Sequence, residues 1–115
     1  MKGGIAVSVL VPVYNTADTL ARCLRSLADQ TLRNIEIICV DDGSDERTKA
    51  KLSLLAAEDP RIRVFTHEQN RGSMAARKTG LENARGAYVM YLDSDDEFTP
   101  DACEKAYAAI RPARA

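Results

Sequence analysis

The sequence lacks the features that mark several large protein classes. Its 115 residues include no tryptophan and a single histidine. The formal net charge is −1 at pH 7, so no excess of positive charge favours nucleic acid or an anionic membrane as a partner. No apolar run approaches the roughly 20 residues that a membrane-spanning helix needs, so we expect no transmembrane segment.

Cysteine is scarce too, and its spacing excludes common metal sites. Cys23, Cys39 and Cys103 do not form a metal-binding pattern, so we expect reduced thiols that are buried or half-buried. The first four residues (MKGG) lead directly into a strand-like run and do not resemble a secretory signal peptide. We therefore expect a cytoplasmic protein, with peripheral attachment to the cytoplasmic membrane face left open.

Two phosphate-binding motifs are also missing. No G-x-G-x-x-G follows the first strand-like run, and no G-x-x-x-x-G-K-[ST] occurs anywhere in the chain. A nucleotide site would have to neutralise phosphate by other means. A divalent cation held by carboxylates does this, because Mg²⁺ and Mn²⁺ prefer oxygen ligands and often bind substrate phosphates as well.

What the sequence does contain is a regular alternation of strand and helix patterns. Apolar, β-branched runs predict strands at 6–14, 35–40, 62–66 and 87–92. Helical spacing predicts helices after a cap at Asn15 or Thr16, at 46–58, from a cap at Ser73 to about 84, and from Thr99 or Pro100 onward.

This alternation predicts a single α/β domain over residues 1–115, with a mainly parallel open sheet flanked by helices. Right-handed crossovers place the loops that follow the strands along one edge of such a sheet. Ligands bind at that edge, beyond the carboxyl ends of the strands.

Asp93, Ser94, Asp95 and Asp96 follow the last predicted strand. Three carboxylates in four residues repel one another, and a bound cation would relieve that repulsion. Asp93 and Asp95 point the same way while the strand pleat persists. The alternative is a solvated loop that leads into a helix. A calcium loop is excluded, because Phe98 stands where that loop needs glycine.

A second acidic pair, Asp41 and Asp42, ends the strand predicted at 35–40. Gly43 and Ser44 are explained by a tight turn and a helix start. A turn does not explain two adjacent acids at the end of an apolar strand. An aspartate carboxylate can accept the imide N–H of uracil, so the pair is a candidate for base recognition.

Three weaker candidates lie at the same predicted edge. In the Asn-Arg-Gly segment at 70–72 and in the helix after it, Arg71 or Arg77 can face phosphate or balance the acidic edge. The alternative is an ordinary loop and a solvated helix face. Tyr14 can stack on a base or belong to the core. His67 has no second histidine or nearby cysteine, so we expect a structural role for it.

In this order and spacing, the motifs resemble the family 2 glycosyltransferases of the GT-A fold. The resemblance is carried by SVLVPVYNTADTL, by QTLRNIEIICVDDGSDERT and by NRGSMAARKTGLENARGAYVMYLDSDDEFTPD, and it covers residues 6–106. It implies the Rossmann-like, N-terminal nucleotide-sugar-binding half of a longer enzyme. It also implies that the following residues bind the donor: Pro12, Val13, Tyr14, Asn15, Asp41, Asp42, Asn70, Gly72, Arg77, Asp93, Ser94 and Asp95.

Individual roles follow from the same resemblance. Asp42, with Asp41 beside it, would contact the uracil of a UDP-sugar. Asp93-Ser94-Asp95 would be the D-x-D motif, with Asp95 as the direct ligand of Mn²⁺ or Mg²⁺ and Asp93 as the second metal residue. The implied reaction is inverting transfer from a nucleotide sugar to a saccharide or lipid-linked acceptor, in cell-wall or polysaccharide biosynthesis.

The chain departs from the family mainly in length. The acceptor site and the acceptor base are expected beyond Ala115, so we expect the isolated chain to be inactive. A non-catalytic nucleotide-sugar-binding module stays open as an alternative. A receiver-like signalling domain is less favoured, because it needs a lysine at the end of a later strand. A nucleotidyltransferase would carry a glycine-rich, basic loop after the first strand, which PVYNTADTL is not.

Overall fold

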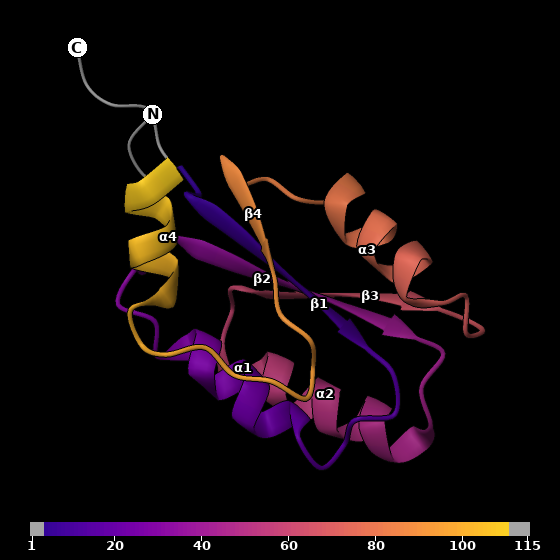
Figure 1. Cartoon of the computed structure of the whole chain (residues 1–115). Coiled ribbons are helices and arrows are strands. Elements are labelled where there is room, and N and C mark those ends of the chain that lie inside the picture. The colour runs from indigo at the N-terminus through magenta and orange to yellow at the C-terminus, as the bar shows by residue number, and fades with distance from the viewer. Residues whose placement is uncertain (1–3, 111–115) are drawn as a thin grey trace.

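The protein, seen here as a computed structural model that describes residues 4–110, is built on one four-stranded sheet (Figure 1). The strands are β1 (Val7–Val13), β2 (Ile35–Asp42), β3 (Ile62–His67) and β4 (Tyr88–Tyr91). The helices are α1 (Leu20–Ala28), α2 (Glu46–Glu58), α3 (Ser73–Glu82) and α4 (Ala102–Ile110). All strand pairs are parallel, in the order β3-β2-β1-β4, so the predicted α/β class is confirmed.

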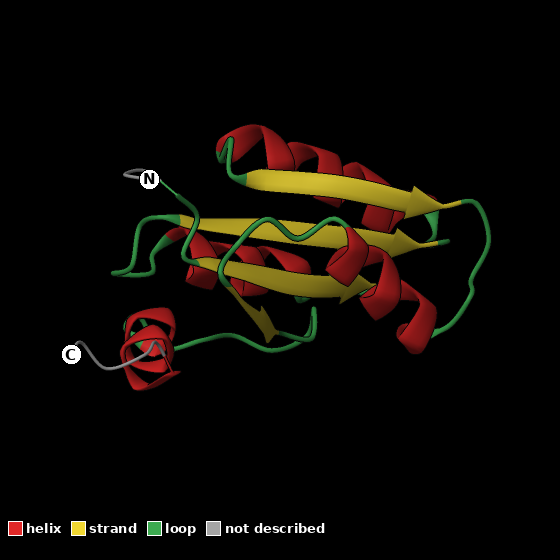
Figure 2. Cartoon of the chain, turned by 90° about the horizontal axis from the view of Figure 1, so that it is seen from above, coloured by secondary structure: helices red, strands yellow, loops and turns green. Residues whose placement is uncertain are grey.

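The strand order sets where the helices lie. The chain moves outward from β1 through β2 to β3, then returns to the other side of β1 to form β4. Right-handed crossovers require the helix to change face when the direction reverses. Accordingly, α1 and α2 cover one face of the sheet and α3 covers the other (Figures 1 and 2). The change of direction falls between β1 and β4, where open α/β sheets bind ligands.

Alternation along β1 divides the core between these two layers. Val9 and Val11 are fully buried in the larger cluster, which includes residues of α1, α2 and α4. Leu10 points the opposite way and packs with Ile38 and Ala76 under α3. Both faces of β1 are therefore apolar, as expected for a central strand of a parallel sheet.

Two predicted helices begin at other residues than expected. The first begins at Leu20 rather than after Asn15 or Thr16. Asn15 has a φ of 53°, and its Oδ1 accepts a hydrogen bond from the Asp45 amide at 2.8 Å, so it ties two loops together. The last helix begins at Ala102, later than predicted.

Two further boundaries differ by a few residues. Gly72 precedes α3 as its cap, so Ser73 is the first helical residue rather than the cap. β2 extends to Asp42 instead of ending before the acids: Asp41 pairs with both β1 and β3, and Asp42 pairs with β3. The helix predicted at 46–58 is confirmed, with the Asp45 side chain accepting from the Thr48 amide at 2.8 Å.

The expectation for the thiols is confirmed, since all three cysteines are free and buried. None of the helices in the described part of the chain is long and apolar enough to cross a membrane.

Candidate functional site

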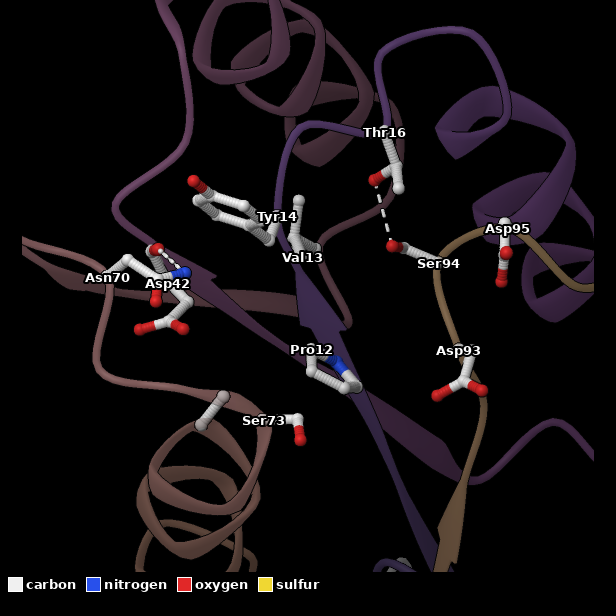
Figure 3. A pocket seen from close by; sticks show the side chains of 11 residues that line it. Pro12, Val13, Tyr14, Thr16, Asp42, Asn70, Ser73, Asp93, Ser94 and Asp95 are labelled. Atoms are coloured by element: carbon white, nitrogen blue, oxygen red, sulfur yellow. Dashed lines mark hydrogen bonds between the residues drawn. The ribbon is translucent and has the colours of Figure 1, made fainter.

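A pocket of about 330 Å³ opens at the carboxyl edge of the sheet, between the ends of β1 and β4 (Figure 3). It is lined by Pro12, Val13, Tyr14, Thr16, Asp42, Asn70, Ser73, Ala76, Asp93, Ser94 and Asp95. Most of the predicted donor-binding residues therefore come together in one cavity. Asn15, Asp41, Gly72 and Arg77 do not line it, and the reasons differ from one to the next.

The end of β1 forms one wall of the pocket. Pro12 follows Leu10 on the face covered by α3 and so turns toward the pocket. Tyr14 lies just beyond the strand with 49% of its surface exposed, which leaves its ring accessible for stacking. The core alternative for Tyr14 is therefore wrong.

Asp42 lies at the end of the pocket away from Asp93 and Asp95 (Figure 3). Hydrogen bonds hold its carboxylate in place. Its Oδ1 accepts from the Arg71 amide at 2.8 Å and lies 2.8 Å from His67 Nδ1, and its Oδ2 accepts from the Gly72 amide at 2.9 Å. Burial alone would raise the pKa of this carboxyl. The hydrogen bonds from His67 and from the two amides outweigh burial and hold the pKa below its ordinary 3.8.

Asp41 does not lie beside Asp42 in the pocket, which corrects the expectation from the sequence. Adjacent side chains of a strand point to opposite faces, so Asp41 is directed toward α2. Its carboxylate accepts from Lys49 Nζ at 2.8 Å and from the Ser44 amide at 3.0 Å. Burial would raise the pKa of Asp41, but these partners lower it below 3.8. Asp41 therefore fixes the turn after β2.

Two glycines let the loops approach each other around Asp42. A Cβ on Gly43 would lie 2.5 Å from the Asn70 amide nitrogen, so only glycine lets the turn after β2 touch the loop after β3. Gly43 also has a φ of 72° and Gly72 a φ of 98°. Gly72 does not line the pocket, and its backbone amide donates to Asp42 instead. Asn70 donates from Nδ2 to the Asp42 carbonyl at 3.4 Å.

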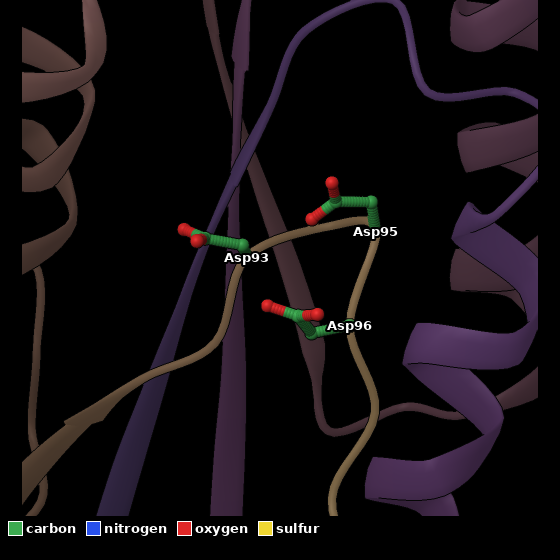
Figure 4. A group of neighbouring side chains, drawn as sticks. All are labelled: Asp93, Asp95 and Asp96. Carbon is green, nitrogen blue, oxygen red and sulfur yellow. The ribbon is translucent and has the colours of Figure 1, made fainter.

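The acidic segment after β4 is a tight turn, closed by the Asp96 amide donating to the Asp93 carbonyl at 2.9 Å. One carboxylate oxygen each from Asp93, Asp95 and Asp96 lies within 4.8 Å of the others, and all three residues are exposed (Figure 4). These oxygens are hard donors that converge with room for water, so they fit Mg²⁺ or Mn²⁺. The turn brings in Asp96, which the sequence did not single out as a ligand.

The turn is anchored through its backbone and Ser94 rather than through its carboxylates. Thr16 Oγ1 donates to Ser94 Oγ at 2.8 Å, and Thr19 Oγ1 donates to the Ser94 carbonyl at 3.0 Å. The Cys23 thiol donates to the Asp93 carbonyl at 3.6 Å. Burial, with the nearby carboxylates, raises the pKa of Cys23 to about 12. Thr16 and Thr19 could not be assigned from sequence, because their partners lie more than 70 residues away.

Arg77 lies beside the acidic turn but does not line the pocket. Its Nη2 is 3.8 Å from Asp93 Oδ1, and its guanidinium stands 5.4 Å from the centre of the Tyr91 ring. Of the two roles that the sequence left open for it, balancing the acidic edge matches this placement.

His67 is buried within the protein, which is compatible with the structural role expected for it. It is 7% exposed, and its two ring nitrogens lie 2.8 Å from Asp42 Oδ1 and from Thr79 Oγ1.

Comparison with known proteins gives the family and the fold of the chain. The sequence model of glycosyl transferase family 2 matches residues 8–115. The putative glycosyltransferase EpsH of Bacillus subtilis is 46% identical over 100 residues, which are 87% of this chain and 29% of that protein.

Two solved structures share the fold. S. aureus TarS 1-349 in complex with UDP superposes with a TM-score of 0.83 at 30% identity, covering 91% of this chain and 32% of that one. The mannosyltransferase PcManGT from Pyrobaculum calidifontis, in complex with GDP-Man and Mn²⁺, gives a TM-score of 0.78 at 27% identity, covering 90% and 31%.

The chain spans less than a third of each of these relatives. Within that span, the family model, the sequence relatives and the solved structures agree. The parallel sheet and its flanking helices share the GT-A fold of these glycosyltransferases, and the chain belongs to glycosyl transferase family 2.

Proposed function

We propose that this chain is the donor-binding half of a glycosyltransferase and holds a nucleoside-diphosphate sugar, with UDP-sugars favoured, together with a divalent cation. The observation that carries the proposal is the lining of the pocket. Asp42, which can accept an N–H, stands at one end, and Asp93 and Asp95 stand at the other. A nucleotide base and a metal-bound diphosphate need these two chemistries in one cavity.

The base end supports a uracil ring. Asp42 is ionised and has acceptor capacity beyond its three protein donors, so it can accept the imide N–H. The half-exposed ring of Tyr14 offers a face for stacking. The related TarS binds UDP, as its complex records.

The phosphate end supports a metal. Asp95 and Asp93 would hold the ion, and Asp96 is close enough to take part directly or through water. When bound, Mn²⁺ or Mg²⁺ would neutralise the diphosphate and act as a Lewis acid toward the departing group. The mannosyltransferase relative binds GDP-Man with Mn²⁺, which supports this chemistry but leaves the choice of metal open.

For the whole enzyme we propose inverting transfer to a saccharide or lipid-linked acceptor, in a cytoplasmic setting and in polysaccharide or cell-wall synthesis. Asp42 is occupied by three donors and the acids of the turn face the metal position. None of these pocket carboxylates is placed to activate an acceptor hydroxyl. We therefore expect the chain alone to bind donor without transferring sugar.

Titration calorimetry of UDP into the 115-residue chain, with and without Mn²⁺, tests the proposal. We expect binding that strengthens at least tenfold when Mn²⁺ is present. Asp95→Asn should abolish this gain, because it removes the charge of the expected ligand. Asp29→Asn is the matched control, since Asp29 is exposed at the far end of α1. Metal-independent UDP binding, or the same gain in Asp95→Asn, would overturn the metal assignment.

A further inference from the structure

We propose that His67 and Thr79 are positioning residues that orient the Asp42 carboxylate and thereby set the preference for uracil over cytosine. This inference rests on the proposed function, because it concerns the base end of the same pocket. Neither residue lines that pocket, so each acts through Asp42.

The three side chains form a continuous chain from β2 through β3 to α3. His67 Nδ1 lies 2.8 Å from Asp42 Oδ1, and His67 Nε2 lies 2.8 Å from Thr79 Oγ1. The ring and the carboxylate are both buried, with side-chain exposures of 6% and 4%. Both ring nitrogens are therefore occupied, and the ring cannot rotate without breaking two hydrogen bonds.

The partners determine which ring nitrogen carries the proton. Asp42 is ionised, because its pKa is lowered, so its carboxylate can only accept. Nδ1 must therefore be a donor. In the neutral ring Nε2 is then an acceptor, and the Thr79 hydroxyl donates to it. The hydroxyl thus gives Nε2 of this tautomer its partner and fixes the plane of the ring against Asp42.

This arrangement leaves Asp42 a defined acceptor direction. A carboxylate has about four acceptor positions. Oδ1 receives His67 and the Arg71 amide, while Oδ2 receives the Gly72 amide alone. The remaining position, on Oδ2, fits a single N–H donor such as the uracil imide. The corresponding ring nitrogen of cytosine is an acceptor and would face the carboxylate unfavourably.

Losing the Thr79 hydroxyl should weaken this selection. Without it, Nε2 loses its partner and only the hydrogen bond to Asp42 holds the ring, which can then turn away from Oδ1. The carboxylate then loses one of the three donors that orient it. A network of this kind acts through hydrogen bonding rather than through volume, so an isosteric substitution separates the two effects.

Thr79→Val, measured in Mn²⁺ with UDP and with CDP, tests the proposal. We expect UDP affinity to fall about three- to tenfold, the range for one lost hydrogen bond. CDP affinity should change little, so the UDP-to-CDP ratio falls by a similar factor. Thr79→Ser should restore the ratio, because it keeps the hydroxyl.

Thr48→Val is the matched control. Thr48 is also a helical threonine, and its buried hydroxyl has no hydrogen-bond partner among the described residues. It should leave both affinities unchanged. An unchanged ratio in Thr79→Val, or an equal loss for both nucleotides, would overturn the positioning role and leave only a packing role.

A second measurement needs no nucleotide. His67 is the only histidine of the sequence, so its ring signals can be assigned directly in ¹⁵N NMR. We expect the Nδ1–H tautomer in the unmodified chain, and a shifted Nδ1 signal in Thr79→Val as the hydrogen bond to Asp42 weakens. A dominant Nε2–H form in the unmodified chain would overturn the inference. If the tautomer is as expected but UDP does not bind at all, the proposed function fails rather than the hydrogen-bond assignment.

Discussion

Two acidic groups lie at the same edge of the sheet in opposite surroundings. Asp41 and Asp42 are 2% and 3% exposed, and each carboxylate accepts hydrogen bonds from protein donors. Asp93, Asp95 and Asp96 are exposed and face one another. Arg77 approaches this group, with its Nη2 atom 3.8 Å from Asp93 Oδ1.

The two groups differ in when the negative charge of their carboxylates is compensated. The buried pair gains its donors during folding, and these outweigh the cost of burial and lower both pKa values. The exposed group stays hydrated, with a mutual repulsion that a cation would relieve. The buried pair should therefore govern stability, and the exposed group should govern metal binding.

The largest effect expected from this difference is the loss of Asp42. Asp42→Ala leaves two amides and the His67 ring without their acceptor, which should cost about 2–4 kcal/mol of unfolding free energy. Urea denaturation measures this loss. Asp95→Ala is the comparison and should change stability by no more than about 0.5 kcal/mol. Equal losses in the two variants would contradict the division between the groups.

Bound metal should make the stability of the chain depend on the exposed group. With UDP present, Mn²⁺ at 100 times its dissociation constant should stabilise the chain by about 2.7 kcal/mol. Thermal unfolding with and without a chelator measures the shift. Asp95→Asn should show no shift, while Asp29→Asn should keep it. A full shift in Asp95→Asn would place the ion elsewhere.

The parts of the fold that sequence predicted well are those with local causes. The bounds of α2 follow from the Asp45 cap before it and Pro60 after it, both visible in the sequence. The predicted start of α1 was wrong, because the side chains of Asn15 and Thr16 do not cap the helix. They form hydrogen bonds with Asp45 and Ser94, which lie in distant loops. Propensity cannot reveal such long-range partners.

The candidate site shows the same limit. That Asp42 and the acidic turn share an edge followed from parallel strands, and the pocket confirms it. The sequence grouped Asp41 with Asp42, because it did not reveal that the strand continues through both acids and sends them to opposite faces. His67 and Thr79 were beyond reach as a pair, since their contact depends on how α3 packs on the sheet.

Acid should affect the buried pair in a defined direction. Asp41 and Asp42 have folded-state pKa values below their ordinary 3.8. Their contribution to stability is complete above about pH 4 and is lost as the pH falls through the folded values. We expect stability to decline below pH 4, less steeply in Asp42→Asn, by a smaller amount than the effects above because burial already offsets part of each shift. An equally steep decline in Asp42→Asn would assign the acid sensitivity to other carboxylates.

The smallest effect separates Asp96 from Asp95 within the exposed group. Asp96→Asn removes one charge from the turn while its amide still closes it onto Asp93, so stability should change by no more than about 0.5 kcal/mol. If Asp96 acts only through its negative charge and does not coordinate the ion, Mn²⁺ affinity in the presence of UDP should fall about fivefold in Asp96→Asn. This factor corresponds to about 1 kcal/mol, the effect of a hydrated charge a few ångströms away. Asp95→Asn should lose far more, because it removes a directly coordinating charge. A larger loss for Asp96→Asn, measured in the same metal titration, would centre the ion on the third aspartate of the turn rather than on the D-x-D pair.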